Sequence, residues 1–157
     1  MAYIVLLCWL GACALQDAQH RKIANLLTLG GLCIALAYLL WSGNSLTGAS
    51  PPAVARAIGI ACLLSLPGYL SRQMGSADVK LLVALGAASD AAHVLFSVIA
   101  AALVQITWVT LVRIWPGIRQ ALPQRLVALR TTSAKAPPYA PFLCLGFALT
   151  TLWFIAK

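Results

Sequence analysis

Long apolar runs alternate with short polar segments along this chain. An α-helix needs about 20 apolar residues to cross the hydrocarbon core of a bilayer. Several of the runs reach or approach that length, so the pattern predicts an all-α, polytopic bundle of transmembrane helices. The runs cover about residues 2–16, 25–41, 53–70, 79–113 and 139–156.

The run from Val79 to Arg113 is too long for a single crossing. As one helix it measures roughly 50 Å, whereas the core of a bilayer is about 30 Å thick. Glycine and polar residues gather between Gly86 and His93, and we expect the helix to break there. The run then becomes a short fourth helix of about ten residues and a full-length fifth, which gives about six helices in all.

Composition supports a membrane protein. The chain has 157 residues, of which 62% are hydrophobic and 9% charged, and its mean hydropathy is +0.91. A soluble domain of this size needs far more polar surface, so ordinary soluble classes are excluded. We expect residues 1–157 to form a single membrane-embedded domain.

The basic residues indicate how the helices are oriented. Eleven Lys and Arg give a net charge of +8, but they are spread between apolar runs rather than gathered on a hydrophilic domain, which argues against a nucleic-acid partner. Nine of them fall on the side that holds Asp17, Asp78 and the segment 113–135, and the other two are Arg56 and Lys157. The positive-inside rule makes the nine-residue side cytoplasmic. The basic segment 113–135 is interpreted as an anchor for anionic membrane lipids.

Cysteine spacing gives no support for a metal site. Five cysteines lie in apolar stretches, and no two of them form a CxxC pair. We therefore expect buried free thiols rather than a zinc site or a disulfide framework. The five are Cys8, Cys13, Cys33, Cys62 and Cys144.

Only three carboxylate side chains occur in the whole chain: Asp17, Asp78 and Asp90. On the predicted topology, Asp17 and Asp78 lie at the same membrane face and Asp90 lies at the other. Two carboxylates at one depth can form an acid/base dyad, which hydrolyses a peptide without metal or cofactor. The simpler alternative for Asp78 is a helix N-cap, whereas Asp17 follows a helix C-terminus, where the dipole disfavours a negative charge. That asymmetry predicts Asp78 as the ionised base and Asp17 as the protonated member.

Three segments resemble the type IV prepilin peptidases, which are GxGD aspartic peptidases. Asp17 followed by Arg-Lys-Ile-Ala-Asn at 21–25 is similar to the family's first aspartate motif. Gly-Ser-Ala-Asp-Val-Lys-Leu-Leu at 75–82 is similar to its GxGD motif, and Pro-Tyr-Ala-Pro-Phe at 138–142 to the start of its last helix. Two positions depart from the family pattern. Ala24 stands in place of Pro, and Ala77 stands in place of the second Gly, where a positive φ would make a Cβ costly.

The resemblance implies an activity and a set of partners. It implies a small stand-alone peptidase of the Flp, or tight-adherence, type in the bacterial inner membrane, which cuts a basic leader from prepilin or pseudopilin at the cytoplasmic face. The paired CxxC motifs of the larger, bifunctional members are missing, so we expect no methyltransferase activity. The rival functions are a non-catalytic assembly factor of a pilus or secretion system, and a small ion-coupled transporter.

Six further residues are candidates for supporting roles. Gly75 is expected to supply backbone freedom before Asp78. Lys80 either steers the charge of Asp78 or anchors the helix, and Asn25 either bonds near the dyad or caps the second helix. Pro138, Tyr139 and Pro141 either line a substrate groove or start a helix at the membrane interface.

Overall fold

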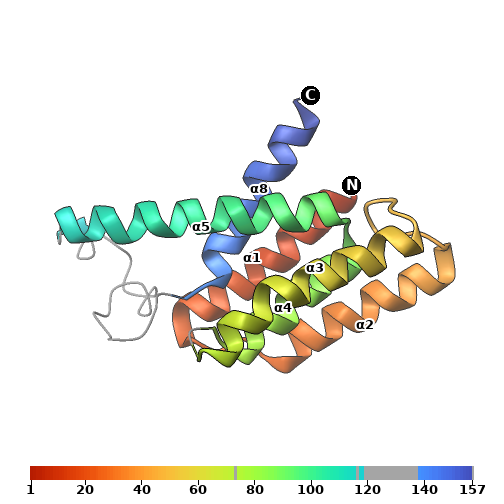
Figure 1. Ribbon diagram of the computed structural model, residues 1–157, viewed down its shortest axis with the longest axis horizontal. Coiled ribbons are helices and arrows are strands. Elements are labelled where there is room, and N and C mark those ends of the chain that lie inside the picture. The colour runs from red at the N-terminus through yellow and green to blue at the C-terminus, as the bar shows by residue number, and fades with distance from the viewer. Residues whose placement is uncertain (73, 116, 119–137, 157) are drawn as a thin grey trace.

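The computed structural model describes residues 1–157 except 73, 116, 119–137 and 157. The described residues form α-helices and contain no strand (Figure 1), which confirms the all-α prediction. Most of the basic segment 113–135 lies outside the described residues. The helices within the described residues are α1 (Ala2–His20), α2 (Asn25–Ser42), α3 (Pro51–Leu70), α4 (Ser76–Ala88), α5 (Ala91–Ile114) and α8 (Ala140–Ile155).

Four of these helices are long and apolar enough to cross a bilayer: α1, α2, α3 and α5. Helix α8 is apolar but has only 16 residues. Large apolar side chains point outward along the helices; Leu26 and Leu40, for example, are 85% and 86% exposed. Backbone bonded within helices and an apolar exterior are what a bilayer requires. The chain is therefore a multi-pass membrane protein.

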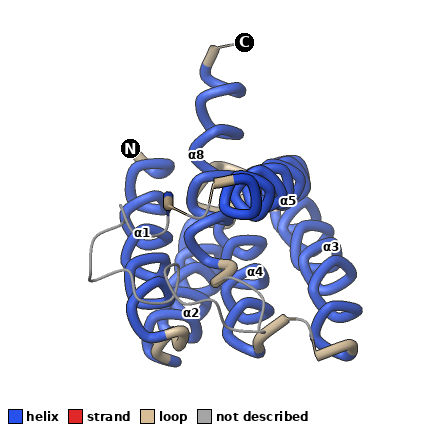
Figure 2. Tube along the Cα trace, turned by 90° about the vertical axis from the view of Figure 1, so that its left-hand side faces the viewer, coloured by secondary structure: helices blue, strands red, loops and turns tan. Residues whose placement is uncertain are grey.

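Successive helices run in opposite directions, so five helix termini lie together at one end of the bundle. The carboxyl ends of α1 and α3 lie there together with the amino ends of α2, α4 and α8 (Figure 1). We call this the Asp17 end. Helix α4 lies between α2 and α3 (Figure 2), and its Leu81, Leu82 and Leu85 are completely or almost completely buried.

Two helix boundaries differ from the sequence prediction in a way that affects the acids. Helix α1 continues past residue 16 to His20, and Arg21 ends it with a left-handed backbone, φ 52°. Helix α4 begins at Ser76 rather than at residue 79 and has 13 residues instead of about ten. Both aspartates therefore lie inside helices, because backbone hydrogen bonding continues where hydropathy falls. The predicted break is confirmed, since α4 ends at Ala88 and α5 begins at Ala91.

Helix α8 packs against both α1 and α5. Its contact with α5 is close at Gly146, where an added Cβ would lie 2.7 Å from the backbone nitrogen of Ala101. Small residues allow such close approach between membrane helices. This contact holds α8 in the bundle, and the amino end of α8 reaches the end of α1.

Candidate active site

Asp17 lies in the last turn of α1, and its side chain is buried, with 7% exposed. The backbone N–H of Ala140 donates a hydrogen bond to its Oδ2 at 3.1 Å, across 123 residues of sequence. Ala140 is the first residue of α8, so its N–H has no partner within that helix. Asp17 therefore occupies the positive end of the α8 dipole. Asp17 lies in the last turn of α1, where the sequence placed it, and the amino end of α8 offsets the unfavourable carboxyl end of α1.

Asp78 is the third residue of α4, and its Oδ2 accepts a hydrogen bond from the backbone N–H of Gly75 at 3.1 Å. The carboxylate thus reaches back over the first turn and satisfies an amide at the start of the helix. This capping contact is compatible with a catalytic role, because it engages only one carboxylate oxygen, Oδ2. Asp78 has a structural role at the start of α4 in addition to any catalytic one.

Asp17 and Asp78 are electrostatic neighbours although they come from different helices. Burial is the main factor that raises the pKa of Asp78 to about 6; the negative charge of Asp17 raises it further, and the Gly75 N–H opposes both. Asp78 lies on α4, which is not one of the four helices long enough to cross a bilayer. A carboxyl that keeps its proton beside an ionised one has the arrangement of an aspartic dyad.

Gly75 and Ala77 occupy the positions of the two motif glycines, and neither position needs the backbone freedom of glycine. Gly75 has φ −76°, which any residue adopts, so backbone freedom is not its role. Instead an added Cβ would lie 3.2 Å from Asp78 Oδ2, and the missing side chain makes room for the carboxylate. Ala77 is the second residue of α4 and is not among the residues with positive φ. Its Cβ therefore carries none of the strain that a left-handed backbone would impose.

Lys80 and Asn25 are brought together by the fold. Lys80 Nζ donates a hydrogen bond to Asn25 Oδ1 at 3.0 Å, which joins α4 to the first residue of α2. Sequence reasoning missed Gln16, whose Oε1 accepts from the backbone N–H of Ala24 at 2.8 Å. Gln16, the residue next to Asp17, thus ties the α1–α2 connection to the last turns of α1. No pattern in the sequence pointed to this bond.

The segment Pro138–Pro141 starts α8 next to both acids. Pro138 and Ala140 are buried and Tyr139 is half-buried. The phenol of Tyr139 faces the charge of Asp78: burial, and then that charge, raise the pKa of Tyr139 well above its usual value. The same residue immediately precedes the amide that holds Asp17. A role for Pro138, Tyr139 and Pro141 in a substrate groove stays a prediction.

Asp90 belongs to a different part of the bundle. It caps the amino end of α5, accepting from the backbone N–H of His93 at 2.9 Å and pairing with His93 Nδ1 at 2.7 Å. It lies between α4 and α5, at the other end of α4 from Asp78. Within the described residues, no three His, Cys, Asp or Glu side chains gather as metal ligands would.

The comparison with known proteins agrees with the motifs. The model of the type IV leader peptidase family matches residues 4–110, a range that contains both Asp17 and Asp78 but not the segment at 138–142. No curated protein and no solved structure matches the chain. The family match covers more than half of the sequence. The chain therefore belongs to the type IV leader peptidase family.

Proposed function

We propose that this chain is an aspartic endopeptidase of the bacterial inner membrane that removes the basic leader of a prepilin or pseudopilin at the cytoplasmic face. Asp17 and Asp78 form its dyad. The observation that supports this most is their convergence: of the three acids in the chain, these two interact electrostatically and the pKa of Asp78 rises to about 6. Family membership gives the reaction class.

The contacts of the two acids favour a division of roles opposite to the one expected from sequence. Asp17 accepts the Ala140 N–H at the positive end of α8, which favours a carboxylate. Burial, and then the negative charge of Asp17, raise the pKa of Asp78 to about 6, which favours a proton on Asp78. We therefore assign Asp17 as the base and Asp78 as the acid.

The dyad then acts in two steps. Asp17 takes a proton from a water molecule, whose oxygen attacks the carbonyl carbon, while the Asp78 proton polarises the carbonyl oxygen. The tetrahedral intermediate collapses when the leaving nitrogen receives the proton held by Asp17 and the C–N bond breaks. Asp78 recovers its proton as the new carboxyl group forms. The pair titrates as a unit, so one shared proton is the active form.

The two rival functions have weaker support. A non-catalytic assembly factor was argued from Ala77, but Ala77 lies in a helix and is not among the residues with positive φ. A transporter that couples ions is expected to have an acid near mid-membrane. Asp17 and Asp78 instead lie in the last turn of α1 and the first turn of α4.

The test is removal of a leader in cells. The chain is co-expressed with a candidate prepilin that carries a basic leader, and leader removal is followed by gel mobility for wild type, Asp17→Asn and Asp78→Asn. Asp90→Asn is the matched control, because it removes the one remaining carboxylate. We expect processing by wild type and Asp90→Asn only. Processing by either dyad variant, or equal loss in Asp90→Asn, contradicts the assignment.

A further inference from the structure

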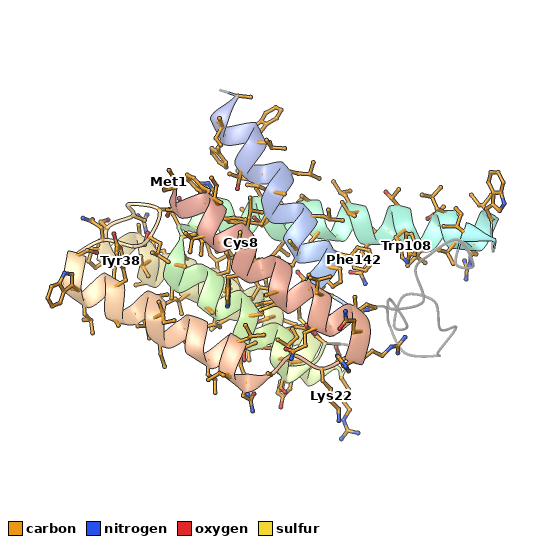
Figure 3. The ribbon with its side chains drawn as sticks, turned by 180° about the vertical axis from the view of Figure 1, so that it is seen from behind. Met1, Cys8, Lys22, Tyr38, Trp108 and Phe142 are labelled. Atoms are coloured by element: carbon orange, nitrogen blue, oxygen red, sulfur yellow. The ribbon has the colours of Figure 1, made fainter. Side chains whose placement is uncertain are left out.

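The contact between Asp17 and Ala140 fixes how α1 and α8 face each other. Helix α1 ends and helix α8 begins at the Asp17 end, so the two helices extend from this contact side by side with antiparallel chain directions (Figure 3, where Phe142 marks the first turn of α8). Moving one turn along each helix leads to Cys13, four residues before Asp17, and to Cys144, four residues after Ala140. Residues four apart lie on the same helix face. Cys13 and Cys144 therefore lie at the same level of the packed α1–α8 pair.

The packing of the two thiols agrees with this register. Cys13 is completely buried in the core, and Cys144 is half-buried and packs against that core. Both are free thiols. By contrast, Cys8 and Cys33 are exposed, on the outer faces of α1 and α2.

We propose that Cys13 and Cys144 form a dithiol site one helical turn from Asp17, which two-electron thiol oxidants convert into a disulfide between α1 and α8 that stops the peptidase. Two S–H bonds break and one S–S bond forms. The two electrons and two protons pass to the oxidant, such as the N=N bond of an azodicarboxamide, which becomes a hydrazine. A dithiol reductant reverses the step by thiol–disulfide exchange.

Inhibition follows from where the bond forms. A disulfide restricts its two Cα atoms to about 4.4–6.8 Å and fixes the Cβ directions. This constraint lies one turn from the Ala140 amide that holds Asp17. A dyad tolerates little displacement, since a shift of about 1 Å slows catalysis roughly a hundredfold. This part of the proposal rests on the proposed function, whereas formation of the disulfide does not.

The first measurement counts thiols and needs no activity. Full-length protein in membranes is treated with diamide, denatured without reductant, and labelled with a polyethylene-glycol maleimide that shifts gel mobility once for each free thiol. We expect wild type to lose two of its five thiols, and Cys144→Ala and Cys13→Ala to lose none. Cys33→Ala is the matched control, which loses two of the remaining four. No loss in wild type, or an undiminished loss in Cys144→Ala, overturns the site.

The second measurement follows leader removal by the same samples. Oxidised wild type is expected to slow by about a hundredfold and to recover with dithiothreitol, while Cys144→Ala keeps its rate in diamide. A disulfide that forms without slowing cleavage overturns the inhibition. If no sample removes a leader under reducing conditions, the proposed function fails, and the thiol count still decides whether the dithiol site exists.

Discussion

Ala77 occupies a position where the family motif has glycine, and its backbone explains why the substitution is compatible with activity. It is the second residue of α4 and is not among the residues with positive φ. Glycine there would increase the conformational freedom of the unfolded chain without relieving any strain, which lowers the free energy of unfolding by up to about 1 kcal/mol. We expect Ala77→Gly to lower thermal stability slightly and to leave leader removal near the wild-type rate. A large gain in rate would mean that Ala77 does impair the site.

The ionisation of Asp78 predicts a pH dependence with a definite sign. As the acid of the dyad it must carry a proton, and burial and the charge of Asp17 raise its pKa to about 6. The proton is present below that pH and is lost above it. We therefore expect kcat/KM for leader removal to fall as the pH rises through about 6, measured on solubilised enzyme from about pH 5 to about pH 8.

The control for this profile is Asp90→Asn, which alters a carboxyl outside the dyad and should leave the curve unchanged. A rate that instead rises through the same pH range would make Asp78 the base. It would restore the division of roles that helix ends alone predicted from the sequence.

At the scale of single residues, the motifs singled out Asp17 and Asp78 but did not predict the contacts that each of them makes. Asp17 and Asp78 were singled out by charge bias and motif, and the structure makes them neighbours. The favourable partner of Asp17 was not predictable, because Ala140 lies 123 residues away and donates through its backbone. Gly75 was explained by backbone freedom, whereas the structure shows that its missing Cβ leaves room for Asp78 Oδ2.

The packing of α8 against α5 gives a prediction about helices. At Gly146 an added Cβ would lie 2.7 Å from the backbone nitrogen of Ala101, so Gly146→Ala must push the two helices apart. Overpacking of this kind costs about 1–3 kcal/mol. Displacement of α8 also moves the Ala140 amide, so we expect a lower melting temperature together with slower leader removal.

Gly59 provides the matched control for that change. It lies inside α3, and an added Cβ there meets nothing within 4 Å. Gly59→Ala should therefore be neutral or stabilise the protein by up to about 1 kcal/mol. Equal melting temperatures for the two alanine variants would show that the α5–α8 contact is looser than described.

The bond between Lys80 and Asn25 ties α4 to α2, at 3.0 Å between Nζ and Oδ1. Because the pair is partly exposed to solvent, we expect a coupling of at most about 1 kcal/mol between Lys80→Met and Asn25→Ala in a double-mutant cycle on thermal unfolding. Lys22→Met, which removes another basic residue at the Asp17 end, serves as the uncoupled control. Additive effects of Lys80→Met and Asn25→Ala would contradict the bond.

Hydropathy predicted the existence of the helices more accurately than their ends. The break between α4 and α5 follows from a length that no bilayer accommodates, and the structure confirms it. The carboxyl end of α1 and the start of α4 were misjudged by three or four residues, because hydrogen bonding along the backbone continues through polar side chains. For a site built at helix ends, those residues decide whether an aspartate lies on a helix or in a loop.

For the whole molecule, the distribution of basic residues predicts an orientation that the bundle makes testable. Lys22 follows α1 at the Asp17 end, and Asn44 lies in the connection after α2, at the opposite end; both are exposed. The positive-inside rule predicts that Lys22 faces the cytoplasm. In a background without the native cysteines, Asn44→Cys should react with a membrane-impermeant maleimide in spheroplasts, and Lys22→Cys only after the membrane is opened. The reverse pattern would put Asp17 and Asp78 at the outer face, where they could not meet a leader that carries its positive charge on the cytoplasmic side.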